Sequence, residues 1–124
     1  MILYEEKRKI LNEMARVGFT SDSYEIYVRT NDSGNIPHFH YWDTLTKGDV
    51  FHTCIRIDSP EYFHHTGKED ELNSKQKKSL IQFLLKQHST LGISNWKYLI
   101  ALWNDNNSDV YVDIDSEMPD YSTL

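Results

Sequence analysis

Three neighbouring segments of the chain alternate between apolar and polar side chains with a period of two residues. They read SYEIYVRT, IPHFHYWD and VFHTCIRID, and they cover residues 23–30, 36–43 and 50–58. This period is that of a β-strand with one packed and one polar face. Short stretches rich in Asn, Asp, Gly and Lys separate the segments, as is typical of hairpin turns. The sequence therefore predicts a three-stranded antiparallel meander.

Helical patterns flank the predicted strands. Residues 3–17 place their apolar side chains on one helical face, and Gly18 follows in the position of a C-terminal cap. Further along, Asn73 and Gln76 form a capping-box pattern ahead of a leucine-rich stripe. Ser94 precedes a second stripe that contains two tryptophans. We predict an α+β fold in which an N-terminal helix and two C-terminal helices pack on one face of the sheet.

The last part of the chain differs in composition from the rest. Residues 105–124 contain no Lys or Arg, whereas acidic residues recur throughout. Within them VYVDI, residues 110–114, is either a short fourth strand at the sheet edge or part of a solvated tail. A chain of 124 residues is expected to form a single domain, 1–124. We expect a core over residues 1–104 and an acidic tail over residues 105–124.

Charge and cysteine content narrow the classes of function. The net charge of −6 argues against direct nucleic-acid binding, because phosphate contacts need clustered Lys and Arg, and it favours a partner with a basic surface. Cys54 is the single cysteine, which excludes an internal disulfide and a metal site with several thiolates. The sequence shows neither a membrane-spanning run nor a signal-peptide core, so we expect a cytoplasmic protein that does not bind membranes.

The phases of the three strands together predict one polar sheet face. If the apolar faces join a common core, the opposite face gathers ionisable and aromatic side chains from all three strands. Cross-strand neighbours on such a face lie about 4.5–5.5 Å apart. The predicted set is Glu25, Tyr27, Arg29, His38, His40, Trp42, His52, Cys54, Arg56 and Asp58.

Several chemistries are open to that face. His38 and His40 form a His-x-His pattern that directs both imidazoles to the same side, as in sites for Zn or another divalent transition metal. The third ligand is His52 or, alternatively, a carboxylate from Glu25 or Asp58. The same residues also allow a Cys54 nucleophile with a histidine base, or general acid–base catalysis. An ordinary polar strand face is the simplest interpretation.

Residues 36–103 also resemble a known family. The run Ile-Pro-His-Phe-His at residues 36–40, the strand ending Ile-Arg-Ile-Asp and the helix opened by Asn-Trp are similar to a family of small bacterial domains of unknown function. Members carry Pro-Pro-His-Phe-His in the corresponding strand and are often encoded near toxin–antitoxin genes. The resemblance implies an α+β fold and a bacterial or phage origin, and it implies no catalytic residue. Ile36 departs from the family's first proline.

From these patterns we expect a small cytosolic binding or regulatory protein of a mobile element or phage, without a cofactor. It would be antitoxin-like or an inhibitor of a nucleic-acid enzyme, and it would dock on a protein partner. The alternative is a metal-dependent hydrolase that uses His38, His40 and His52. The docking surface would comprise the polar sheet face, without Cys54, together with Asp113, Asp115 and Glu117.

Overall fold

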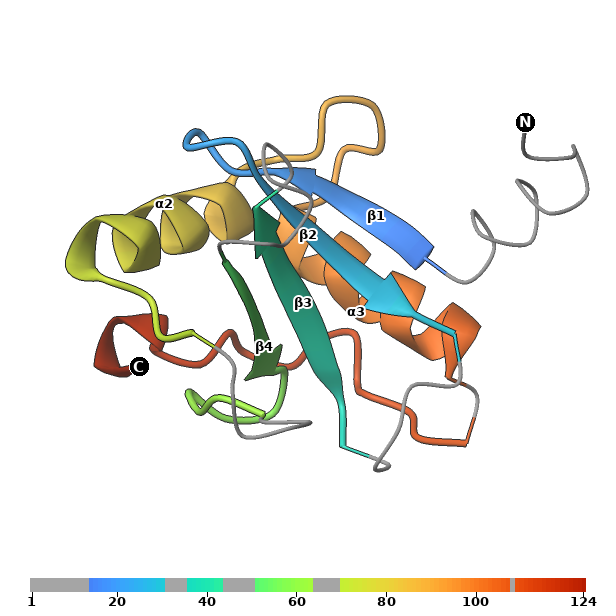
Figure 1. The fold of residues 1–124 in the computed structure, drawn as a ribbon. Coiled ribbons are helices and arrows are strands. Elements are labelled where there is room, and N and C mark those ends of the chain that lie inside the picture. The colour runs from blue at the N-terminus through green and yellow to red at the C-terminus, as the bar shows by residue number, and fades with distance from the viewer. Residues whose placement is uncertain (1–13, 31–35, 44–50, 64–69, 108) are drawn as a thin grey trace, which may run out of the picture.

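The protein is described by a computed structural model that covers residues 14–30, 36–43, 51–63, 70–107 and 109–124. Four antiparallel strands form a sheet of order β1-β2-β3-β4, and two helices follow in the chain (Figure 1). The α+β class and the antiparallel meander are thus confirmed. The elements are β1 (Met14–Phe19), β2 (Tyr24–Arg29), β3 (His38–Asp43), β4 (His52–Arg56), α2 (Ser74–Leu85), α3 (Asn95–Asn106) and the short 3-10 helix η2 (Tyr121–Thr123).

The fourth strand, β1, corrects the prediction at the N-terminus. Residues 14–17 were expected to end a helix, but they lie in β1, whereas residues 3–13 of that predicted helix are outside the described residues. Ala15 and Val17 pack toward the core while Arg16 is exposed, so the period is two. Pairing with β2 decides the conformation here, because Met14 and Val17, three residues apart, also satisfy a helical period.

Gly18 was predicted to cap a helix, and this prediction is wrong. The residue lies in β1, at the point where the pairing with β2 shifts register. A Cβ at this position would lie 2.9 Å from the ring of Phe83 on α2. The glycine therefore allows the helix to approach the strand closely.

The two helices begin where the sequence predicts. Asn73 accepts a hydrogen bond from the Gln76 backbone N–H, and the Gln76 side chain accepts one from the Asn73 backbone N–H, which completes the capping box of α2. Ser94 caps α3 by accepting from the Lys97 backbone N–H. Both helices bury their apolar stripes in one core with the sheet, which includes Leu80, Leu84, Leu99, Ile100, Trp103, Ile26, Phe39 and Ile55.

The C-terminal segment packs on this core instead of forming a solvated tail. No strand forms at residues 110–114. The indole N–H groups of Trp96 and Trp103 donate to the carbonyls of Ser116 and Val110, at 2.9 and 2.8 Å. Tyr121 is fully buried in η2, and its hydroxyl donates to the Arg56 carbonyl at 2.6 Å. Half-buried apolar residues between the acidic ones explain this packing. The high acidic content of the segment had suggested a solvated tail instead.

Candidate metal centre on the polar sheet face

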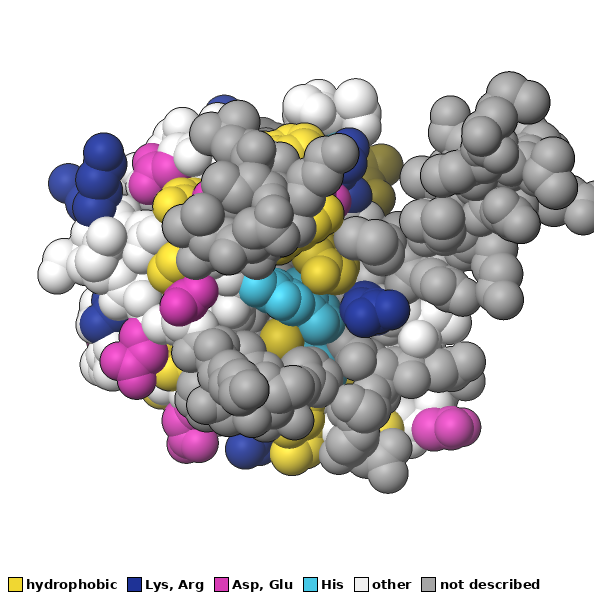
Figure 2. All heavy atoms as spheres, viewed as in Figure 1, with side chains coloured by type: hydrophobic (Ala, Val, Ile, Leu, Met, Phe, Trp, Pro, Cys, Tyr) yellow, Lys and Arg dark blue, Asp and Glu magenta, His cyan; other side chains and the backbone are white. Residues whose placement is uncertain are grey.

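The strand register places the predicted polar residues on one face of the sheet. Tyr27 of β2 pairs with His40 of β3, which pairs with Cys54 of β4. These three residues form one row across the sheet. The neighbouring rows hold Glu25, Trp42 and His52, and His38 with Arg56. Figure 2, viewed as in Figure 1, shows histidine side chains gathered at the centre of this face.

Much of this face is buried, contrary to the expectation of an open docking surface. Glu25 and Tyr27 are 4% and 6% exposed, and His38, His40 and Cys54 are at most 2% exposed. Side chains at this depth do not offer a flat contact area to a large partner. Arg29 is exposed, and Trp42, His52 and Arg56 are partly exposed.

Three of the buried side chains form a cluster with metal-ligating atoms. His38, His40 and Cys54 each offer one ligand atom, and these atoms all lie within 4.8 Å of one another. The His40 Nδ1 atom is 3.4 Å from the Cys54 Sγ atom. The cluster therefore joins the adjacent strands β3 and β4. Among the described residues, these three side chains are the ones placed close enough together to hold one metal ion.

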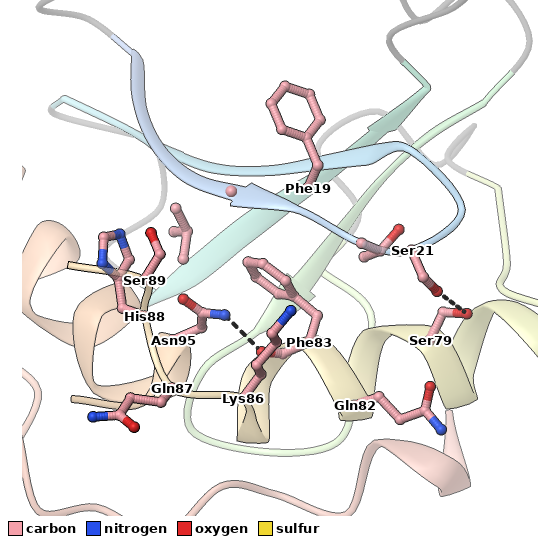
Figure 3. Close-up of a pocket in the computed structure, with 13 residues that line it drawn as sticks. Phe19, Ser21, Ser79, Gln82, Phe83, Lys86, Gln87, His88, Ser89 and Asn95 are labelled. Atoms are coloured by element: carbon pink, nitrogen blue, oxygen red, sulfur yellow. Dashed lines mark hydrogen bonds between the residues drawn. The ribbon is translucent and has the colours of Figure 1, made fainter. Parts of the chain in front are cut away.

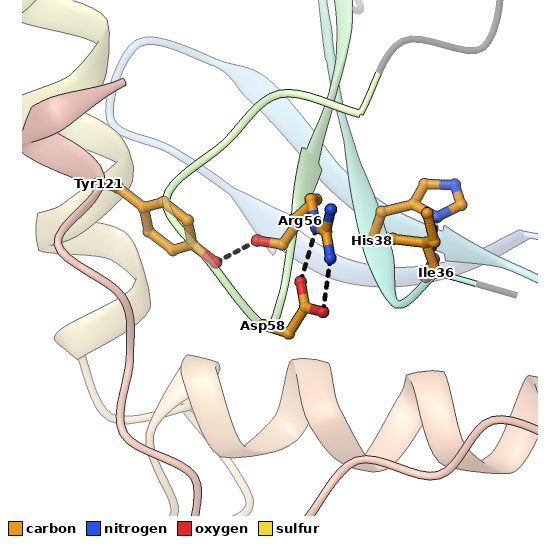
Figure 4. A network of polar contacts seen from close by, with 5 residues as sticks. All are labelled: Ile36, His38, Arg56, Asp58 and Tyr121. Carbon is orange, nitrogen blue, oxygen red and sulfur yellow. Dashed lines mark hydrogen bonds and ion pairs between the residues drawn. The ribbon is translucent and has the colours of Figure 1, made fainter. Parts of the chain in front are cut away.

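The backbone fixes the orientation of the His38 ring. Its Nδ1 atom lies 2.6 Å from the Ile36 carbonyl oxygen, so Nδ1 carries the proton and donates (Figure 4). In the neutral ring Nε2 is then the atom with the lone pair. A histidine that donates its other N–H to a carbonyl is the usual arrangement of a metal ligand. The ring of Phe63 packs against His38 at a centroid distance of 4.4 Å and restricts it further.

His40 is held between neighbours on both adjoining strands. The Tyr27 ring stacks on it with a centroid distance of 4.7 Å and an interplanar angle of 8°. On the other side its Nδ1 atom faces Cys54 and also lies 3.0 Å from the Nε2 atom of His52. These contacts direct Nδ1 toward the cluster.

His52, the third ligand predicted from the sequence, lies at the rim of this cluster. Its Nε2 atom is 3.0 Å from His40 Nδ1 and 3.5 Å from the Tyr27 hydroxyl. The tighter group nevertheless contains Cys54 in its place. The strand register explains this substitution, because Cys54 is the direct partner of His40 whereas His52 is the partner of Trp42.

The two carboxylates considered as ligands are bound to arginines instead. Arg16 Nε donates to Glu25 Oε1 at 3.0 Å. Arg56 donates from Nε and a terminal nitrogen to the two carboxylate oxygens of Asp58, both at 2.8 Å (Figure 4). Hydrogen bonds from Arg56 lower the pKa of Asp58, and the same pairing raises the pKa of Arg56. The role of Arg16 was missed because its segment was predicted to be helical.

The acidic part of the predicted docking surface lies elsewhere in the molecule. Asp113, Asp115 and Glu117 are exposed on the C-terminal segment, where Lys97 Nζ of α3 lies 3.8 Å from an Asp115 oxygen. The structure thus divides the predicted docking residues into a sheet-face group and an acidic row, which we define as Asp113, Asp115 and Glu117.

The Cys54 nucleophile considered above has the required neighbour but not the access. His40 is within reach of the sulfur as a base. The Cys54 residue is 0% exposed, so a substrate could not reach the thiol without movement of its surroundings. A buried thiol beside two imidazoles fits metal ligation better than attack on a substrate.

Comparisons of the chain with protein families, curated proteins and solved structures find no match. In the described part of the chain, neither helix has the length and hydropathy needed to cross a bilayer.

Proposed function

We propose that the protein binds a transition metal ion, with Zn²⁺ best suited, through His38, His40 and Cys54. The observation that carries this proposal is the convergence of two imidazole nitrogens and one thiol within 4.8 Å on a buried face. One sulfur and two nitrogens favour Zn²⁺ over Mg²⁺ or Ca²⁺, which prefer oxygen ligands.

The observed spacing is close to what a tetrahedral ion needs. Zn–N bonds of about 2.0–2.1 Å and Zn–S bonds of about 2.3 Å place the ligand atoms of one ion about 3.3–3.6 Å apart. The 3.4 Å between His40 Nδ1 and Cys54 Sγ lies within this range. The remaining separations are at most 4.8 Å, so these side chains would have to move closer together to hold one ion.

Three protein ligands would leave one coordination position for water, as in catalytic zinc sites. A bound metal lowers the pKa of such a water toward neutrality and makes it a nucleophile. The partly exposed His52 stands at the rim beside His40, where its imidazole can exchange a proton with this water. These features support a metal-dependent hydrolase, the alternative raised by the sequence.

Co²⁺ substitution tests ligand identity directly. We expect one equivalent of Co²⁺ to give the intense visible bands of a four-coordinate ion and a near-ultraviolet thiolate-to-cobalt band. Cys54→Ser removes the thiolate band, and His38→Ala or His40→Ala weakens binding by about tenfold or more. His88→Ala is the matched control, because this histidine lies outside the cluster.

His52→Ala distinguishes a site whose fourth ligand is water from a site whose fourth ligand is His52. If water occupies the fourth position, this variant keeps the four-coordinate cobalt spectrum but loses hydrolysis of activated esters such as 4-nitrophenyl acetate. A spectrum that changes to a different coordination geometry would instead make His52 the fourth ligand and contradict the hydrolase proposal. Absence of any Co²⁺ or Zn²⁺ binding by the folded protein would contradict the metal site itself.

The acidic row supports a second candidate function, docking on a protein with a basic surface. Ile114 and Met118 pack against the core, which fixes the neighbouring carboxylates of the row toward solvent. A fixed row of this kind complements the basic groove of a nucleic-acid enzyme. Such docking is the role of an antitoxin-like protein or an inhibitor from a phage or mobile element, the setting of the bacterial family that residues 36–103 resemble.

Charge removal tests this second candidate. When the three carboxylates of the row are replaced by amides in the triple variant D113N, D115N and E117Q, we expect salt-sensitive binding to the partner captured from the source cell to be lost. The control changes exposed acidic residues elsewhere, with E61Q, D70N and E71Q. Equal binding by both triple variants would contradict docking through the acidic row.

A further inference from the structure

A cavity lies away from the metal cluster, where the end of β1 meets the end of α2 and the start of α3 (Figure 3). Its volume is about 540 Å³, within the range of small-molecule sites. Val17 and Phe83 supply apolar surface, and Gly18 allows Phe83 to lie against the strand. The cavity shares no residue with the cluster on the opposite face.

The charge of the cavity wall contrasts with that of the whole chain. None of the residues that line it is acidic, although the net charge of the protein is −6. Lys86 lines it and has no ion-pair partner in the described part of the chain. Figure 3 shows the Lys86 side chain rising from the end of α2 toward β1. Asp22 accepts hydrogen bonds from the lining residues Ser21 and Ser79, so the wall favours a negatively charged group at its Lys86 end.

His88 adds a hydrogen-bond donor to the same wall. Its Nδ1 atom accepts the backbone N–H of Thr90 at 3.2 Å, so the proton of the neutral ring is on Nε2. The ring packs edge-on against Tyr98 at a centroid distance of 4.6 Å, which fixes its orientation. Lys86 and His88 thus each offer a donor at the cavity wall.

Asn95 supplies the acceptor. This residue is 5% exposed, and its Nδ2 atom donates to the Phe83 carbonyl at 2.8 Å. Its amide oxygen receives no hydrogen bond from any residue that the structure describes, and the residue lines the cavity. In Figure 3 the oxygen lies on the side of the amide away from that hydrogen bond. The oxygen is not among the buried side-chain atoms that lack a partner, so it is accessible and can accept a ligand N–H.

We propose that this cavity binds a small carboxylate that carries an N–H group next to an apolar side chain, the chemistry of an N-acylated hydrophobic amino acid. Lys86 and His88 contact the carboxylate, and the Asn95 oxygen accepts the N–H. Val17 and Phe83 contact the apolar side chain. The binding site is independent of the proposed metal function, since its residues are separate.

N-acetyl-L-leucine is the probe. In the presence of EDTA, it is titrated into the ¹⁵N-labelled full chain, and amide chemical shifts are followed by NMR. We expect saturable shifts of the Gly18 and Lys86 backbone amides and of the Asn95 side-chain NH₂. In the analogue 2-acetoxy-4-methylpentanoate an ester oxygen replaces the N–H, so this acid should bind about tenfold more weakly. Equal affinities for the two acids would overturn the role of Asn95.

Variants test the location. Lys86→Ala should weaken binding of N-acetyl-L-leucine about fivefold, as for a partly exposed ion pair. Lys75→Ala, an exposed lysine on α2 that does not line the cavity, should leave binding unchanged. Ser89→Trp places a large side chain in the cavity from an exposed loop position and should abolish binding. An absence of saturable shifts in the wild type, or unchanged binding by Lys86→Ala and Ser89→Trp, would overturn the proposal.

Discussion

The two faces of the sheet are both buried near their centre, but with different chemistry. The face under the helices carries Ile26, Phe39 and Ile55, which are fully buried among apolar neighbours. The opposite face carries His38, His40 and Cys54 at similar depth. Apolar side chains at these three positions would pack without the cost of removing polar groups from water. This contrast supports the proposal that the second face binds a ligand, whereas the first face contributes to stability.

The largest expected loss of stability comes from a substitution in the face that packs against the helices. Phe39→Ala should lower the free energy of unfolding by about 3–5 kcal/mol, because it opens a cavity under a fully buried ring. His40→Ala, next to it in the strand but on the other face, should cost less in metal-free buffer. Urea denaturation in the presence of EDTA measures both. Equal losses for the two variants would contradict the division of roles between the faces.

Adding metal should raise the free energy of unfolding through the histidine face. Zn²⁺ at a free concentration about 100 times its dissociation constant should raise the free energy of unfolding by about 2.7 kcal/mol, because the ion binds only the folded chain. Cys54→Ser should lose most of this gain, and Phe39→Ala should keep it. Thermal unfolding with zinc or EDTA provides the measurement. The same zinc-dependent shift in Cys54→Ser and the wild type would exclude Cys54 as a ligand.

Two tyrosines sharpen the account of the helix-packed side. The Tyr121 hydroxyl donates to the Arg56 carbonyl, whereas the Tyr41 hydroxyl is buried near the Thr20 side chain but makes no hydrogen bond of ordinary geometry among the described residues. Burial raises the pKa of both phenols, so both stay protonated. Tyr121→Phe should cost about 1 kcal/mol, and Tyr41→Phe should leave stability unchanged or increase it. Chemical denaturation measures both, and a larger loss for Tyr41→Phe would show a partner for its hydroxyl.

The smallest effect concerns pH at the rim of the histidine face. Arg56 lowers the pKa of Asp58 below its usual 3.8, so the pair stabilises the folded chain above that pH. This contribution is lost as the pH falls through the lower folded-state pKa. Because the Asp58 side chain is 43% exposed, the effect should stay under about 1 kcal/mol. Asp58→Asn should reduce stability at about pH 6 but change it little at about pH 2. An equal loss at both values would contradict this linkage.

The sequence predicts the parts of the fold that local chemistry determines. Strands β2, β3 and β4 follow from alternation, and α2 and α3 from Asn73 and Ser94. Strand β1 could not be found in this way, because its residues also match a helical period and pairing with β2 decides between the two. The packing of residues 109–124 likewise depends on the tryptophan N–H groups of α3 rather than on local composition.

The candidate site shows the same limit. Alternation placed His38, His40, His52 and Cys54 on one face, which the register confirms. It could not show that Cys54 opposes His40, because a shift of register changes every cross-strand neighbour. Burial was also beyond the sequence, since it depends on which segments cover the face. From the sequence, Cys54 was considered only as a nucleophile, although its place on the same predicted face as His38 and His40 was the signal that could have included it among the ligands.

The zinc content per chain shows whether the histidine face is a metal centre. The protein is purified without a histidine tag, equilibrated with excess Zn²⁺ and separated from free ion, and its zinc is measured by elemental analysis. We predict about one zinc per chain for the wild type and for His88→Ala, and much less for His38→Ala, His40→Ala and Cys54→Ser. A wild-type protein that is fully folded and retains no zinc would contradict the assignment of the histidine face as a metal centre.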